Sequence, residues 1–134
     1  MTETAAERLR AIALHWMEEG WQKGNAAIVD ELHAEDFVDH DSAGRAGDRE
    51  GFKEGIRALY AAFPDFYATA EGMVIDVTTG SVAVRWSATG TQQGMFMGVP
   101  PTGKRFTFVG IEIIRVENDR IVERWGLWDG GLPG

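Results

Sequence analysis

The sequence predicts an α+β fold in which helices come first and a meander of long antiparallel strands follows. Apolar residues recur at three- and four-residue spacing over residues 4–23 and again over 49–62, which indicates two amphipathic helices. From residue 67 onward the period changes to two, which is typical of strands with one buried face. A sheet of such long strands must be strongly twisted, so helices on one face would close a cone around its concave side.

The helical half of the chain has clear start and stop signals. Thr4 is followed three residues later by Glu7, which resembles a capping box at the start of the first helix. Pro64 ends the last helix of this half. In chain order, the elements expected after the first helix are a shorter helix over 26–32, a short strand over 37–41, a Gly-containing loop over 42–48 and a helix over 49–62.

The second half reads as four strands and one long loop. The short connection Thr79-Gly80-Ser81 favours an antiparallel hairpin between the first two strands. The segment 94–103 is rich in Pro and Gly, and we expect it to be a loop whose apolar side chains cover the mouth of a cavity. The strands are expected over residues 67–78, 82–93, 105–116 and 120–128.

Composition limits the classes of function. The chain of 134 residues suits one domain, residues 1–134, and its net charge of -8 argues against binding to nucleic acid or to an anionic membrane surface. It has no cysteine, and no apolar run approaches the roughly 18 residues of a membrane helix. Because the first residues also lack the basic start and apolar stretch of a signal peptide, we expect a cytoplasmic protein.

Three local motifs resemble those of one protein family. They are Gly90-Thr91-Gln92-Gln93-Gly94 with the following Met97–Lys104, the segment Ile121–Trp125 with Asp129 four residues later, and Val38-Asp39-His40-Asp41 ahead of the third helix. Over nearly its whole length the chain resembles the SnoaL-like polyketide cyclases. This family belongs to the nuclear transport factor 2-like (NTF2-like) superfamily, whose cone-shaped fold packs N-terminal helices on a strongly curved antiparallel or mixed sheet.

The resemblance implies a reaction as well as a fold. In the cyclases of this family, an Asp near the end of the final strand is the general acid/base of an intramolecular aldol ring closure, with no metal or organic cofactor. Its motif position matches Asp129. Many members carry His where this chain has Gln92, and Gln cannot shuttle a proton. The reaction type therefore stays open between cyclisation, isomerisation and related lyase or hydrolase chemistry.

The residues themselves suggest the same chemistry. A carboxylate that follows an aromatic strand end is withdrawn from water, which raises a carboxyl pKa and suits acid/base work near neutral pH. We therefore expect Asp129 to face a pocket, with Gln92 or His40 binding the developing oxyanion. The plainer alternative is that Asp129 ends the strand and faces water. The expected lining of the pocket is Phe37, Tyr60, Phe63, Trp86, Met95, Phe96 and Trp125.

These observations leave two main hypotheses. The first is a cofactor-independent enzyme acting on a hydrophobic, cyclic molecule that carries a carbonyl group, and the second is a non-catalytic binding module for such a molecule. The spacing of His33 and His40 is not that of metal ligands, so no metal site is expected. A structural or assembly role is a third hypothesis. We expect a homodimer, with a row such as Val109, Ile111 and Ile113 on one strand supplying the surface through which it forms.

Overall fold

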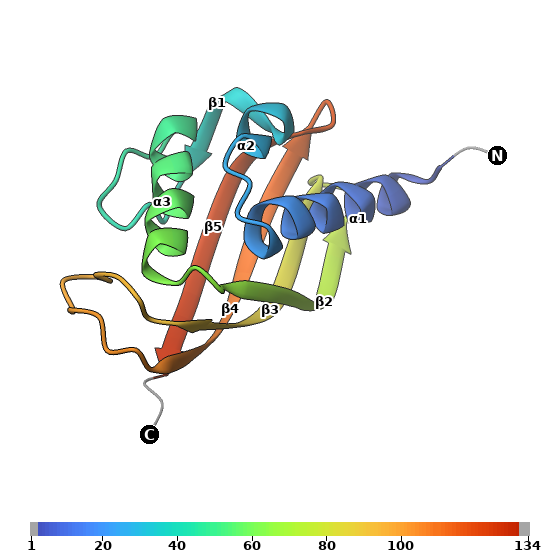
Figure 1. The fold of residues 1–134 in the computed structure, drawn as a ribbon. Helices are drawn as coiled ribbons and strands as arrows, with labels where there is room; N and C mark the ends of the chain where they lie inside the picture. The colour runs from blue at the N-terminus through green and yellow to red at the C-terminus, as the bar shows by residue number, and fades with distance from the viewer. Residues whose placement is uncertain (1–2, 132–134) are drawn as a thin grey trace.

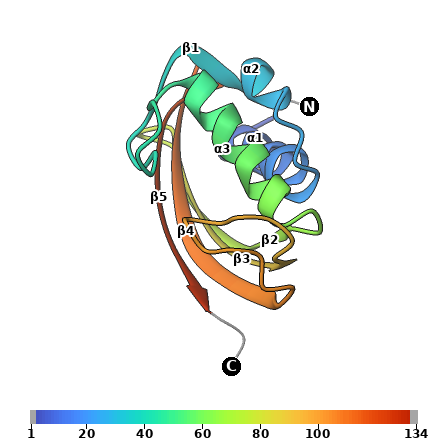
Figure 2. The same cartoon turned by 60° about the vertical axis from the view of Figure 1, so that its left-hand side comes forward.

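Five strands form one curved sheet, and the helices cover its concave face (Figures 1 and 2). The structure is a computed structural model that describes residues 3–131. The helices are α1 (Ala5–Trp16), the π-helix η1 (Met17–Gln22), α2 (Ile28–Leu32) and α3 (Arg49–Ala62). The strands are β1 (His33–Asp39), β2 (Tyr67–Asp76), β3 (Ser81–Thr91), β4 (Arg105–Glu117) and β5 (Arg120–Gly131).

The strand order is β1-β5-β4-β3-β2, so the meander predicted from the sequence is confirmed. Strands β2 to β5 pair antiparallel with their chain neighbours, whereas β1 adds to the edge of β5 in parallel and makes the sheet mixed. The strand predicted over residues 37–41 is instead His33–Asp39, because the backbone becomes extended at His33, directly after α2, and turns at His40 and Asp41. The predicted α+β class, with helices before strands, agrees with this architecture.

The first helix begins as predicted but changes its winding. Thr4 Oγ1 accepts the backbone N–H of Glu7, and Glu7 returns a bond to the backbone of Thr4, which completes the capping box. After Trp16 the α-helix becomes the π-helix η1. The wider turn brings Trp16 and Trp21, five residues apart, to the same side of the helix, with ring centroids 5.5 Å apart. None of the helices among residues 3–131 is long and apolar enough to cross a membrane.

The core lies between the helices and the concave face of the sheet, and it contains one histidine. His33 is fully buried, and its ring packs edge-on against Trp16 and Phe37. Its Nδ1 lies 3.1 Å from Val29 O, while its Nε2 has no hydrogen-bond partner among the described residues. Burial lowers the pKa of His33 to about 3, so the ring is neutral at physiological pH and Nδ1 donates to the carbonyl.

Candidate active site

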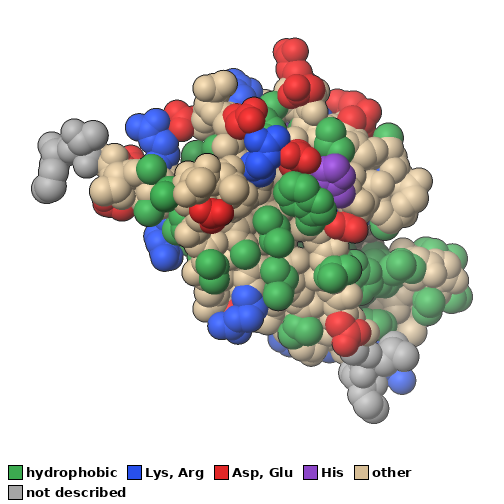
Figure 3. All heavy atoms as spheres, turned by 180° about the vertical axis from the view of Figure 1, so that it is seen from behind, with side chains coloured by type: hydrophobic (Ala, Val, Ile, Leu, Met, Phe, Trp, Pro, Cys, Tyr) green, Lys and Arg blue, Asp and Glu red, His purple; other side chains and the backbone are tan. Residues whose placement is uncertain are grey.

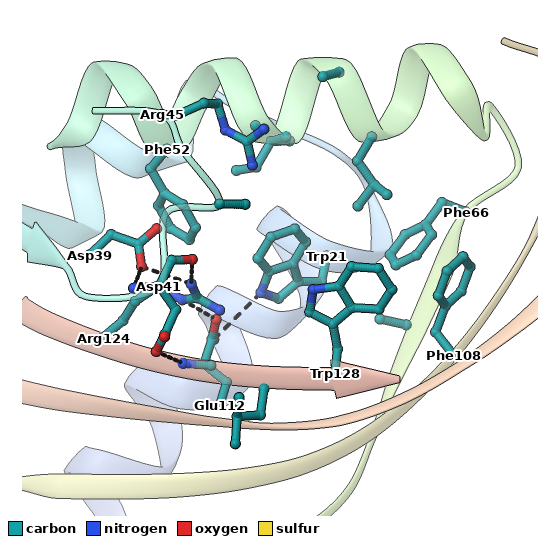
Figure 4. Close-up of a pocket in the computed structure, with 18 of the residues that line it drawn as sticks. Trp21, Asp39, Asp41, Arg45, Phe52, Phe66, Phe108, Glu112, Arg124 and Trp128 are labelled. Carbon is teal, nitrogen blue, oxygen red and sulfur yellow. Dashed lines mark hydrogen bonds and ion pairs between the residues drawn. The ribbon is translucent and has the colours of Figure 1, made fainter. Parts of the chain in front are cut away.

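A cavity of about 760 Å³ lies between the concave face of the sheet, α3 and the loops that follow β1 and β3 (Figure 4). This volume is in the range of small-molecule binding sites. Charged side chains gather with Phe52 at one end of the cavity, and the rings of Trp128, Phe66 and Phe108 lie toward the other end. The large apolar residues of the wall include Trp21, Phe52, Ile56, Leu59, Phe66, Trp86, Met95, Phe96, Met97, Phe108 and Trp128.

The charged end is built around Arg124, which points from β5 to the concave side of the sheet. Its Nε donates to Glu112 Oε2 at 2.7 Å, and its Nη1 donates to Asp39 Oδ1 at 2.9 Å. The side chains of these two acids are only 2% and 5% exposed. Burial alone lowers the pKa of Arg124, but the two carboxylates outweigh it and raise that pKa. Arg124 therefore stays a cation held between two buried acids.

Glu112 is also fixed by Trp16 of α1 and Trp21 of η1. Trp16 Nε1 donates to Glu112 Oε1 at 2.8 Å, and Trp21 Nε1 reaches the same oxygen at 3.5 Å. The guanidinium of Arg124 lies over the Phe52 ring, 5.2 Å from its centroid, in a cation–π contact. Both carboxylate oxygens of Glu112 are thus occupied. This group shapes the cavity rather than offering a base to a ligand.

Asp41 is the carboxylate of the cavity that combines a fixed position with exposure. Its Oδ2 accepts the backbone N–H of Gly126 at 2.8 Å, and its own backbone N–H donates to Asp39 Oδ1 at 3.0 Å. Within residues 3–131, no cation pairs with the Asp41 side chain and no donor reaches its Oδ1. One oxygen is held in place while the other is free to accept a proton, which is the geometry that a general base needs.

The structure corrects the expected positions of His40 and Trp125. His40 Nε2 lies 2.7 Å from Glu123 Oε2, and the His40 ring stacks on Trp125 with centroids 4.8 Å apart. The hydrogen bonds of Glu123 with His40 and with Arg115 lower the pKa of Glu123. All of these side chains lie on the outer face of the sheet. His40 therefore does not reach the oxyanion position that we expected, and Trp125 does not line the cavity.

The expected position of Asp129 is corrected as well. Residues of β5 alternate as predicted, but Arg124 and Trp128 belong to the face that lines the cavity, which leaves Asp129 on the opposite face. Asp129 is exposed and lies opposite Val109, itself 52% exposed on β4. The physical reason is the buried pairing of Arg124, which fixes which face of the strand turns inward.

Gln92 faces inward but serves the neighbouring loop. It is fully buried, and its Nε2 donates to the carbonyls of Gly94, Val99 and Pro100 at 3.0–3.2 Å. Its Oε1 accepts the hydroxyl of Thr102 at 2.9 Å. Every polar atom of the amide is used in these bonds, so the structure corrects the prediction that Gln92 binds an oxyanion. It instead positions the loop that forms part of the cavity wall.

The remaining predicted lining residues divide into two groups. Three of them lie in the cavity wall, namely Trp86, Met95 and Phe96. Phe37 and Phe63 are instead buried in the core, at 2% and 0% exposure. The hydroxyl of Tyr60 donates to Trp21 O at 2.7 Å, and burial raises the pKa of Tyr60 to about 12. The prediction is therefore wrong for these three rings. They pack between the helices and the sheet and do not line the cavity.

Sequence reasoning missed the charged residues of the cavity. Part of the signal was present in the period-two pattern: Phe37 is buried, so Asp39 follows it on the inward face of β1. Asp41 lines the cavity from the turn after this strand. From this stretch, the candidate site residues predicted from the sequence include only His40, which lies between Asp39 and Asp41. Over residues 3–131, no group of three or more His, Asp or Glu side chains is arranged to hold a metal ion.

Solved structures with the same fold come from several bacteria. A candidate polyketide cyclase, IdmH from Streptomyces antibioticus, is 35% identical, with a TM-score of 0.76 over 90% of this chain and 91% of IdmH. A candidate polyketide cyclase from Acidithiobacillus ferrooxidans is 26% identical, with a TM-score of 0.78 over 95% and 92% of the two chains. AclR from Streptomyces galilaeus, a candidate hydroxylase, is 26% identical, with a TM-score of 0.79 over 94% and 91%.

Comparison of the sequence with family models and with curated proteins adds to these structural matches. No curated protein matches the chain. The family model described as SnoaL-like polyketide cyclase matches residues 11–131, which includes every strand and most of the helical half. With this match over nearly the whole chain and a relative at 35% identity, the protein belongs to the SnoaL-like polyketide cyclase family.

Proposed function

We propose that this protein is a cyclase-type enzyme that moves a proton at the carbon next to a carbonyl group of an apolar cyclic molecule. The observation that supports it most directly is Asp41, a carboxylate in the cavity wall with one oxygen anchored by Gly126 and the other free. The aromatic end of the cavity would bury the rings of such a molecule. Asp41 takes the acid/base role that the family motif assigned to Asp129, which lies on the other face of β5.

The proposal is tested with β-tetralone, a bicyclic ketone whose acidic protons flank the carbonyl group. We expect the protein to accelerate exchange of these protons for deuterium, measured by NMR. Asp41→Asn should reduce the exchange rate about 100-fold or more, because the amide cannot accept the proton. Asn still offers an oxygen to the N–H of Gly126, so the fold should persist, which circular dichroism would check.

Asp129→Asn is the matched control, because it makes the same chemical change on the outer face. It should keep the exchange rate. Loss of exchange in this variant, with normal exchange in Asp41→Asn, would reject Asp41 as the base in favour of the motif residue. Binding of β-tetralone without any exchange in the unchanged protein would favour the second candidate, a non-catalytic binding module.

We also propose that the chain forms a homodimer through the outer face of its sheet. Figure 3 shows hydrophobic side chains gathered on this face, and exposed apolar residues there include Val109, Ile111 and Ile113 at 52%, 50% and 38%. Light scattering should give a dimeric mass for the unchanged protein and a monomeric mass for Ile111→Asp. Leu14→Asp, which changes an exposed residue of α1 on the other side of the sheet, should remain dimeric.

A further inference from the structure

A second arginine reaches the cavity from the loop after β1. Arg45 lies under α3, across the cavity from β5 (Figure 4). Its backbone N–H donates to Ser42 O at 3.1 Å, and the turn between them uses positive φ angles of 55° at Ala43 and 87° at Gly44. The Arg45 side chain therefore starts from a defined turn, and Ala43, Gly44 and Arg45 itself are exposed to solvent.

Gly55 provides the surface on which the guanidinium lies. A Cβ atom at this position would be 2.8 Å from Arg45 Nη2 and 2.9 Å from Arg45 Nε, closer than such atoms approach. Glycine is a poor residue for the middle of a helix, and Gly55 stands in the middle of α3. Its missing side chain makes the room that the guanidinium occupies against the helix.

The guanidinium of Arg45 has no acceptor in the part of the chain that the structure describes. Among residues 3–131 it makes no ion pair and no hydrogen bond, whereas the other arginine of the cavity, Arg124, is paired with Glu112 and Asp39. An arginine side chain offers five N–H donors in a planar fork. The cavity thus contains one compensated cation and one cation whose donors are free for a ligand.

We propose that Arg45 binds a carboxylate group of the substrate, so that the cavity takes an apolar carbonyl compound that also carries an acid group. The planar guanidinium matches the two oxygens of a carboxylate. A chain with a net charge of -8 repels anions in general, so an anionic ligand requires a local cation of this kind. The inference rests on the proposed function, since it names the substrate class of the same cavity.

The test compares two ligands that differ in one charge, naphthoate and its methyl ester, by isothermal titration calorimetry. The unchanged protein should bind naphthoate about tenfold more tightly than the ester. Arg45→Gln should weaken the binding of naphthoate about tenfold and change the affinity for the ester by less than about twofold. The ester serves as the internal measure of cavity shape, because it fills the same space without the charge.

Two further variants separate recognition from packing. Gly55→Ala places a methyl group 2.8 Å from Arg45 Nη2, so the guanidinium must shift, and it improves the intrinsic propensity of α3. The variant should therefore show a weaker preference for naphthoate while keeping its helix content. Arg57→Gln removes the same charge from the exposed side of α3, outside the cavity lining, and should keep the preference. The pair of results would assign the effect to the position of the guanidinium rather than to net charge.

Three results would overturn the inference: no binding of naphthoate to the unchanged protein, an equal loss of both ligands in Arg45→Gln, or a full preference for naphthoate in that variant. These results are independent of the acid/base test, because naphthoate has no acidic carbon–hydrogen bond to exchange. Arg45-dependent binding without deuterium exchange of β-tetralone would reject the catalytic proposal alone. Exchange without Arg45-dependent binding would reject this inference alone.

Discussion

Replacement of Arg124 by leucine is expected to lower the free energy of unfolding by about 3–5 kcal/mol, because it leaves buried acids without their cation. Glu112 and Asp39 are 2% and 5% exposed at their side chains, and each lies within 3 Å of the guanidinium. Leucine also removes the cation–π contact with Phe52. Urea unfolding at neutral pH, followed by tryptophan fluorescence, measures the loss.

Arg8→Leu is the control, since Arg8 of α1 also pairs with an acid, Asp119, but at the exposed surface. The side chains of Arg8 and Asp119 are 55% and 59% exposed, so the loss should stay below about 1 kcal/mol. Adding Glu112→Gln to Arg124→Leu should recover part of the stability, because the amide keeps an acceptor for Trp16 without a buried charge. A loss below about 1 kcal/mol in Arg124→Leu would contradict this account of the buried pair.

The free energy of unfolding is expected to fall as the pH is lowered from 6.5 towards 5, by up to about 1.4 kcal/mol per pH unit. The cause is His33, whose pKa is lowered by burial from 6.5 in the unfolded chain to about 3 in the folded protein. Between pH 6.5 and 5, His33 becomes protonated in the unfolded chain but stays neutral in the folded protein. Stability therefore rises with pH up to about 6.5 and is flat above it with respect to this group.

The effect of His33 on stability appears at a higher pH than the effect of the acids. Glu7, Glu19 and Glu123 have a pKa lowered from 4.5 by hydrogen bonds, so the stability that they contribute is lost only as the pH falls below that value. Unfolding in urea at several pH values should show the slope in the unchanged protein and not in His33→Phe. His15→Gln, on the exposed side of α1, should keep the slope. A slope that survives in His33→Phe would assign it to another group.

The two expected losses come from features of the tertiary structure that the sequence did not reveal. Arg124 and Glu112 stand in strands where both faces carry apolar residues. In β4, for example, Ile111 and Ile113 are exposed on the outer face while Ile114 is buried. A period of two groups residues into faces, but it cannot say which face is inward when both are apolar. The expected placement of Asp129 and Trp125 failed for this reason.

Other features followed from local chemistry. The capping box at Thr4 and Glu7 and the bounds of α3 depend on neighbours in the chain, and each was predicted and is confirmed. In β3, one face carries mostly polar residues and the other carries Trp86. The alternation therefore predicted correctly that the face of Trp86 and Gln92 turns inward. Local signals sufficed wherever a hydrogen bond or a clear difference in polarity lay within a few residues.

The sequence by itself determined the α+β class, the order of the helices and strands, and the family motifs, because periodicity, capping and turn residues act over short distances. Only the tertiary structure decided which charged side chains meet. Arg124 finds Asp39 from 85 residues away and Glu112 from 12 residues away, and Asp41 is fixed by Gly126 of the parallel neighbour strand. These contacts depend on the register of three strands and on the burial of opposite charges together, which no local pattern records.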